Sequence, residues 1–241
     1  MQSPEKNLVL PKSESWKMFN RISSSYDFLN HLFSMGLDIM WRKKISQFLP
    51  PNAPLTILDL ATGTADVLIT LCQSCARVTS AYGLDLADQM LDIGRRKVNK
   101  AGLDGKIKLQ NADANQIPFA EKYFNVVTMA YGIRNVENPQ KVLSEIYRVL
   151  QDNGRTLILE FSLPVNRFIK AVYLFYLKHV IPILGSIISG DKSAYRYLNQ
   201  TIETFPYGSE FCGLLQAAGF KSVQAHPLCF GIVTIYQADK I

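Results

Sequence analysis

Apolar positions along this chain come in short runs that alternate with helical patterns between Thr56 and about Ser162. Runs such as TILDL and FNVVTMAY are almost continuously apolar, which is typical of strands buried on both faces of a sheet. The segments between them carry apolar residues three and four positions apart, the spacing of a helix with one buried face. Strands that alternate with helices in this way predict right-handed βαβ units and a parallel sheet.

The individual elements can be assigned from this pattern. We expect strands in the stretches TILDL, VTSAYGLDL, KIKLQNAD, FNVVTMAY and RTLILEFS. Helices are expected from about Ala65 to Cys75 and in the stretches ADQMLDIGRRKVNKAG and NPQKVLSEIYRVLQDNG. Near the end of the chain, FCGLLQAAGF predicts another helix. The stretches KSVQAHPL and IVTIYQADK predict an antiparallel hairpin, because a glycine-containing turn separates them.

Two aromatic segments lie outside the alternation of strands and helices. We interpret residues 14–50 as an N-terminal helical cap and residues 163–206 as a helical insertion that forms a lid or substrate site. Both belong to a single domain that spans residues 1–241, a length that suits one large domain.

Charge and cysteine content narrow the class of protein. The net charge of +6 favours anionic partners, nucleic acid or anionic lipid, although a mildly basic soluble enzyme explains it equally well. The basic residues are scattered and form no stripe, so we do not expect nucleic-acid binding. Cys72 and Cys75 lie in a predicted helix with no second pair, so they are interpreted as core residues and no metal site is predicted. The four free cysteines and the absence of an apolar leader pattern favour the cytoplasm.

The turn after the first strand, ILDLATGTAD, indicates which ligand the sheet holds. Ligands of open α/β sheets bind beyond the carboxyl ends of the strands. A dinucleotide fingerprint is excluded because the next glycine after Gly63 is Gly83, and a P-loop is excluded because no Gly-Lys-Ser/Thr follows. Asp66 stands where the helix opens, and its carboxylate would repel a pyrophosphate there.

Acidic residues follow each of the first three strands. Asp59 and Asp66 place carboxylates near the turn. Asp85 is at the end of the second strand, where it can accept hydrogen bonds from a ribose diol. Asp113 follows the third strand and can accept a hydrogen bond from an adenine amino group. Each acid alone is explained as a helix cap or a solvated loop residue. Four of them at one edge of a sheet indicate a cationic nucleoside without phosphate, a description that S-adenosylmethionine (SAM) meets.

Longer stretches resemble a known family. ILDLATGTAD, GLDLADQML, NADANQIPF and FNVVTMAYGIRNVENPQKVLSEIYRVLQDNGRTLILEFS resemble class I SAM-dependent methyltransferases. The stretches MFNRISSSYDFLNHLFSMGLDIMWRKK, YGIRNVENP and YRYLNQTIETFP are similar to the UbiE/MenG family of C-methyltransferases of ubiquinone and menaquinone biosynthesis. Together these stretches cover most of the chain from Trp16 to Phe220.

The resemblance implies a Rossmann-like α/β fold and a set of SAM contacts. The fold would be a seven-stranded, mostly parallel sheet with a C-terminal antiparallel hairpin and helices on both faces. Ala65 departs from the family, which usually has glycine there; its methyl group would lie close to the ligand and disfavours positive φ. The implied cofactor contacts are Gly63, Thr64, Asp85, Asp113 and Ala114, and we add Asp59, the acid of the first strand, to this set.

The implied reaction transfers a methyl group from a sulfonium to a ring carbon of a polyprenylated quinol. We expect Arg134 to stabilise the phenolate and Asn135 to orient a ring oxygen or a water. Asp27 is a candidate base acting through a water, and Tyr26 lies beside it. The alternatives are a surface salt bridge for Arg134 and a helix cap with an aromatic contact for Tyr26 and Asp27.

Weaker candidates complete the site. Two tyrosines in YRYLNQ are expected to line the acceptor pocket, and the three histidines show no partner pattern and are interpreted as structural. These residues are Tyr195, Tyr197, His31, His179 and His226.

The stretch RFIKAVYLFYLKHVIPILGSII bears on where the protein works. It is as long as a membrane-spanning helix, but Lys170, Lys178, His179 and Pro182 near its middle argue against spanning. Interfacial helices or a lid over an apolar pocket fit better, and an ordinary buried helix pair is the alternative. We therefore expect reversible peripheral contact with the inner face of the cell membrane. A homodimer is one option for assembly.

Three functions are compatible with the sequence. The leading one is a quinol C-methyltransferase. A methyltransferase of another lipid or of a small phenol would share the turn and differ in residues 14–50 and 163–206. A non-catalytic lipid-binding protein with the same fold would have lost SAM binding.

Overall fold

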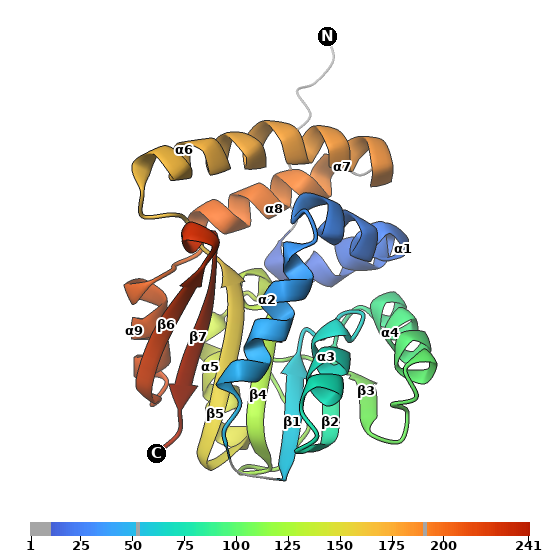
Figure 1. Ribbon diagram of the computed structural model, residues 1–241, viewed down its shortest axis with the longest axis vertical. Coiled ribbons are helices and arrows are strands. Elements are labelled where there is room, and N and C mark those ends of the chain that lie inside the picture. The colour runs from blue at the N-terminus through green and yellow to red at the C-terminus, as the bar shows by residue number, and fades with distance from the viewer. Residues whose placement is uncertain (1–10, 52–53, 190–191) are drawn as a thin grey trace.

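A seven-stranded mixed sheet forms the centre of the computed structural model, which describes residues 11–51, 54–189 and 192–241 (Figure 1). The spatial order is β3-β2-β1-β4-β5-β7-β6. The first five strands are parallel, and β7 runs antiparallel to β5 and to β6, so the predicted sheet and hairpin are confirmed. The strands are β1 (Leu55–Leu60), β2 (Val78–Asp85), β3 (Ile107–Asn111), β4 (Phe124–Ala130), β5 (Leu150–Phe161), β6 (Lys221–Leu228) and β7 (Val233–Asp239).

Successive strand residues bury their side chains in two separate cores. Ile57 and Val126 belong to one apolar cluster, while Leu58 and Val127 belong to the other. Side chains of a strand alternate between its faces, so an almost continuous apolar run fills both cores at once. The first core lies under α2 (Leu37–Ile45), α3 (Asp66–Ser74) and α4 (Asp88–Lys100), and the second lies under α5 (Pro139–Val149) and α9 (Ser209–Ala217).

Helix α5 ends earlier than its apolar spacing predicts. The sequence pattern favours a helix up to Gly154, but the chain leaves the helix at Leu150 and continues as the start of β5. The ammonium group of Lys240 donates hydrogen bonds to the carbonyl oxygens of Tyr147 and Leu150, at 2.7 and 2.8 Å. A cation from the end of the chain thus satisfies carbonyls at this helix terminus, which sequence spacing alone does not reveal.

Four helices gather above the carboxyl ends of the parallel strands (Figure 1). They are α1 (Ser15–Phe33), α6 (Arg167–Phe175), α7 (Ile181–Ser189) and α8 (Lys192–Thr204). Their facing sides share a third apolar cluster, which includes Met18 and Leu29 from α1 and Leu177 and Tyr195 from the later helices. The two aromatic segments of the sequence therefore meet over the edge of the sheet where ligands of this fold class bind.

Helices α6 and α7 form one long rod joined by a π-helical turn, Tyr176–Val180. Pro182 lies just inside α7, and its ring nitrogen carries no hydrogen to bond the carbonyl of Lys178. A π turn directly before the proline takes up this irregularity without breaking the rod. The rod crosses the top of the molecule in Figure 1.

Candidate active site

One pocket, here called the rim pocket, lies beyond the carboxyl ends of β1, β2 and β4. Four of the expected SAM contacts line it together: Gly63, Asp85, Asp113 and Ala114. The start of α1 covers it with Ser15, Trp16 and Phe19. The N-terminal helix therefore forms a wall of the site that the strand-end acids define.

The turn between β1 and α3 is built from left-handed backbone conformations. Ala61, Gly63 and Ala65 have φ angles of 50°, 54° and 65°. An alanine in this region costs about 1–2 kcal/mol relative to the right-handed conformation. The methyl group of Ala65 is fully buried in the core beside Gly94, and does not line the rim pocket, contrary to the expectation that it would lie close to the ligand.

Asp85 fixes this turn from the end of the neighbouring strand. Its two carboxylate oxygens accept hydrogen bonds from the backbone N–H groups of Gly63 and Ala87, both at 2.8 Å. Burial raises the pKa of the Asp85 carboxyl, while these backbone hydrogen bonds favour its ionised form. A carboxylate can accept about four hydrogen bonds, so each oxygen keeps capacity for a ribose hydroxyl.

Asp113 lies in the loop after β3 and lines the rim pocket. Its Oδ1 accepts from the backbone and side-chain N–H groups of Asn115, at 2.8 and 2.9 Å. These bonds hold the carboxylate in place and leave Oδ2 available to an amino group. The residues present therefore fit an adenosine with a cationic substituent.

Two other expected cofactor residues lie beneath the turn instead of in the wall of the rim pocket. Asp59 is almost fully buried, and its Oδ1 accepts a hydrogen bond of 2.6 Å from the hydroxyl of Thr128. Burial raises the pKa of Asp59 from 3.8 to about 7. The hydroxyl of Thr64 donates to Asp27 at 2.8 Å and points away from the pocket.

A chain of ion pairs connects the turn to α1, α2 and α4. Lys97 contacts Asp27 at 2.7 Å and Asp66 at 2.6 Å, and Arg42 contacts Asp66 at 3.0 Å. Asp27 is thus occupied by a cation and lines neither the rim pocket nor the apolar pocket described next, unlike the base that the sequence suggested. The charge of Asp66 is likewise compensated, so it does not supply the acid expected beside the ligand.

A second pocket, here called the aromatic pocket, lies between α1 and the rod formed by α6 and α7. Tyr195 and Tyr197, which the sequence predicted to line an acceptor pocket, are both in its wall. Most of its lining is apolar or aromatic, as in sites for flat organic ligands. Other wall residues are Met18, Ile22, Leu29, Phe33, Phe161, Tyr173, Tyr176, Leu177 and Ile181.

Four residues line both pockets and form their junction: Phe19, Tyr26, Tyr131 and Asn135. The rings of Phe19 and Tyr26 meet edge to face, with centroids 5.9 Å apart. Burial raises the pKa of Tyr26, so its hydroxyl remains neutral. Ligands bound in the two pockets would therefore lie next to each other at this junction.

Arg134 is a buried cation in the wall of the aromatic pocket. Its Nη1 donates to Glu160 at 2.8 Å and to the carbonyl of Tyr131 at 2.6 Å, and its plane lies over the ring of Phe161. Arg134 does form a salt bridge, as the alternative had it, but the pair is buried and not on the surface, because the side chain is 5% exposed. Its Nε is buried and has no hydrogen-bond partner among the described residues.

Asn135 complements Arg134 at the junction. Its amide nitrogen donates to the carbonyl of Tyr131 at 3.0 Å, which orients the side chain. Its Oδ1 is buried and lacks a partner in the described part of the chain. A free donor on Arg134 and a free acceptor on Asn135 suit a ligand oxygen that can carry a proton or a negative charge.

Sequence reasoning missed the roles of Glu160 and Asp38 and the partner of His31. Glu160 is the penultimate residue of β5, and a lone acid in an otherwise apolar run is a signal of a buried ion pair. Asp38 accepts from His31 at 2.7 Å and from Arg42 at 2.6 Å, and lines the aromatic pocket. His31 therefore has a partner that the linear pattern did not indicate.

The Arg134–Glu160 pair generates a stability prediction. Arg134→Met should lower the free energy of unfolding by about 3–5 kcal/mol, because it leaves the Glu160 carboxylate buried without a cation. Adding Glu160→Gln should recover most of the loss, since glutamine keeps an oxygen for the backbone N–H of Phe161. Urea unfolding of both variants measures this, and an equally unstable double variant would contradict it.

The raised pKa of Asp59 generates a pH prediction. The folded protein holds this proton up to about pH 7, whereas the unfolded chain releases it near 3.8, so folding is favoured at low pH. The unfolding free energy should therefore fall by up to about 4 kcal/mol relative to Asp59→Asn as pH rises from 4 to above 7. Denaturation curves at several pH values test this, and parallel profiles would refute it.

Comparison with known proteins shows the family to which the chain belongs. The model of the ubiE/COQ5 methyltransferase family matches residues 9–240. A demethylmenaquinone methyltransferase of Porphyromonas gingivalis is 41% identical over 245 residues, covering 100% of both chains. The ubiquinone/menaquinone biosynthesis C-methyltransferase UbiE of Geotalea daltonii is 40% identical, covering 93% of this chain and 95% of its own.

Solved structures agree on the fold. A SAM-dependent methyltransferase from Thermotoga maritima aligns with a TM-score of 0.66 at 17% identity, covering 94% of this chain and 100% of its own. One from Aquifex aeolicus aligns with a TM-score of 0.59 at 18% identity, covering 83% and 89%. Because the family model spans nearly all of the sequence and the relatives match along their whole length, the chain belongs to the ubiE/COQ5 methyltransferase family, a membership that implies SAM as methyl donor.

Proposed function

We propose that this protein transfers a methyl group from SAM to a ring carbon of a polyprenylated 1,4-quinol, with demethylmenaquinol as the substrate. The observation that carries the proposal is the shared wall of the two pockets. A polar pocket suited to a nucleoside shares Phe19, Tyr26, Tyr131 and Asn135 with a pocket lined mainly by aromatic and aliphatic side chains. The choice of a naphthoquinol follows the naming of the relatives from Porphyromonas gingivalis, Bacteroides fragilis and Thermus thermophilus as demethylmenaquinone methyltransferases.

The rim pocket suits the donor. When bound, SAM supplies an electrophilic methyl group on a cationic sulfur. Asp85 would hold the ribose hydroxyls, and Asp113 would accept from the adenine amino group. Asp27 and Asp66 are paired with Lys97 and Arg42 and do not line the rim pocket, whereas Asp85, Asp113 and Glu137 do.

The aromatic pocket suits the acceptor. A quinol carbon becomes nucleophilic when the neighbouring hydroxyl loses its proton, and a donor fixed beside that oxygen favours the charged form. Arg134 offers its unpartnered Nε–H, and Asn135 offers its unpartnered Oδ1 to the same oxygen before ionisation. Holding the ring in line with the methyl group supplies the remaining acceleration by orientation.

An assay with purified protein, SAM and short-tailed naphthoquinol and benzoquinol acceptors tests the proposal. Mass spectrometry of the products should locate a new methyl group on a ring carbon of the naphthoquinol. Methylation on oxygen, or transfer to the benzoquinol alone, would contradict the assignment. Tight SAM binding without transfer to any quinol would favour another acceptor, and a lack of SAM binding would favour a non-catalytic lipid-binding protein.

The role of Asp85 generates a binding prediction. Asp85→Ala should weaken SAM binding at least about 100-fold, because two hydrogen bonds from a charged group are lost and the turn loses its anchor at Gly63. Asp92→Ala is the matched control, since Asp92 is exposed on α4, pairs with Arg95 of the same helix and does not line the rim pocket. Calorimetric titration with SAM measures the affinity of both variants, and comparable affinities would contradict the role of Asp85 in SAM binding.

We also propose that the enzyme works in the cytoplasm and docks reversibly on the inner face of the cell membrane. Within the described residues, Arg167–Ile188 is long and apolar enough to cross a bilayer by length and composition. In the structure, its inner side packs against α1 through Tyr173, Leu177 and Ile181. A rod whose inner side packs on the protein supports contact with a bilayer surface over insertion across it.

The outer side of the rod supports this docking. Phe168, Val172, Phe175, Ile183 and Ile187 recur at spacings of mostly three or four residues and are all more than half exposed. Such a stripe along a helix suits the interface between lipid headgroups and acyl chains, and the net charge of +6 favours an anionic leaflet. A polyprenyl tail would reach the aromatic pocket from this side.

Vesicle binding tests the docking proposal. Phe168→Asn with Phe175→Asn should weaken partition onto vesicles of phosphatidylglycerol and phosphatidylcholine by about tenfold or more, through loss of buried apolar area. Ile241→Asn is the control, because Ile241 is equally exposed but lies at the opposite end of the molecule (Figure 1). Sedimentation with vesicles measures binding, and equal losses in both variants would contradict a specific docking face.

A further inference from the structure

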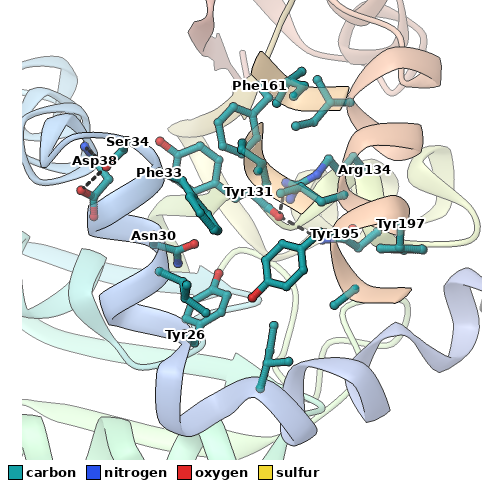
Figure 2. A pocket seen from close by; sticks show the side chains of 18 of the residues that line it. Tyr26, Asn30, Phe33, Ser34, Asp38, Tyr131, Arg134, Phe161, Tyr195 and Tyr197 are labelled. Atoms are coloured by element: carbon teal, nitrogen blue, oxygen red, sulfur yellow. Dashed lines mark hydrogen bonds between the residues drawn. The ribbon is translucent and has the colours of Figure 1, made fainter. Parts of the chain in front are cut away.

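The aromatic pocket has a second polar region, apart from Arg134. Ser34, Asp38 and Arg42 line it on the side formed by the end of α1 and the start of α2. Figure 2 shows Ser34 and Asp38 on one side of the pocket and Arg134 on the other, with aromatic rings between them. A polar group at each end of an otherwise apolar slot suits a flat ring that carries oxygen at both ends.

Tyr131 connects the two regions. Its carbonyl oxygen accepts from Arg134 and Asn135, while its ring stacks against Phe161 with centroids 4.7 Å apart. Its hydroxyl points toward the side where Ser34 and Asp38 lie (Figure 2), and it is buried without a hydrogen-bond partner among the described residues. The residue adopts a φ of 57°, an uncommon conformation for a tyrosine, so the turn holds this side chain in a strained position.

We propose that this region, the Tyr131 hydroxyl together with Asp38 and Ser34, binds the second hydroxyl of the 1,4-quinol, the one remote from the reacting carbon. The inference rests on the proposed function and adds a recognition element to it. Tyr131 would donate to the oxygen of this hydroxyl, and Asp38 or Ser34 would accept its hydrogen.

The hydrogen-bond capacity of Asp38 is consistent with this role. Its carboxylate accepts from Ser34 Oγ at 2.7 Å, from His31 Nδ1 at 2.7 Å and from Arg42 Nη2 at 2.6 Å. A carboxylate offers about four acceptor positions, so one remains. A group that only accepts hydrogen bonds selects a hydroxyl over a carbonyl, and this end of the pocket would therefore favour the reduced quinol over the quinone.

The two ends differ in which form of the substrate oxygen they favour. The guanidinium of Arg134 donates and favours an oxyanion, whereas the carboxylate of Asp38 accepts and disfavours one. Burial raises the pKa of Tyr131 well above its ordinary value, which keeps this hydroxyl a neutral donor. The hydroxyl beside Arg134 would therefore be the one that ionises, and the ring carbon next to it the one that receives the methyl group.

A pair of acceptors and a one-atom deletion test the inference. The first acceptor is a short-tailed 1,4-naphthohydroquinone kept reduced under anaerobic conditions. The second is the matching naphthol that keeps only the hydroxyl next to the reacting carbon. Tyr131→Phe should lower kcat/KM for the hydroquinone about fivefold to tenfold and leave kcat/KM for the naphthol within about twofold. Tyr123→Phe, which removes a hydroxyl from an exposed ring that lines neither pocket, should change neither.

The outcomes separate this inference from the proposed function. Carbon methylation of the hydroquinone by the unmodified protein supports the function whatever the variant does. If Tyr131→Phe lowers kcat/KM equally for both acceptors, or does not lower it for the hydroquinone, the proposed second binding region is wrong and the proposed function stands. A protein that methylates neither acceptor overturns the proposed function, and the inference with it.

Discussion

The contacts of Asp27 hold α1 against the turn that follows β1, and both pockets depend on this attachment. Asp27 accepts from Thr64 in the turn and pairs with Lys97 on α4. Helix α1 supplies Trp16 and Phe19 to the rim pocket and a row of apolar side chains to the aromatic pocket. The Lys97–Asp27 pair is only partly exposed, and its value here lies in placing the helix.

Charge compensation determines which acids remain for ligands. The network that runs from Asp27 through Lys97, Asp66 and Arg42 to Asp38 brings acids and bases together in nearly equal numbers. Asp85 and Asp113 have no basic side chain as hydrogen-bond partner, and both face the rim pocket. With Glu137, these acids outnumber Lys12, the basic residue that lines the rim pocket, and an excess of acid there suits a cationic donor.

The rod of α6 and α7 illustrates how one helix serves two environments. Its inner residues close the aromatic pocket, and its outer residues are apolar and exposed. A helix that is apolar around most of its circumference is normally buried on all sides. Here the side chains of the outer stripe are more than half exposed, which is the physical basis of the proposed bilayer contact.

The sequence by itself determined the fold and the rim of the site. Alternating apolar periodicities require a parallel sheet with helices on both faces, and Gly63, Asp85 and Asp113 follow strands whose carboxyl ends must share one edge. Those residues are local to their strands, so their meeting point follows from topology. The partners of Asp27, Arg134 and Lys240 were decided only by tertiary structure. Each contact joins segments distant in sequence, and a charged side chain in a linear pattern does not reveal whether it faces a ligand, a counter-ion or a helix terminus.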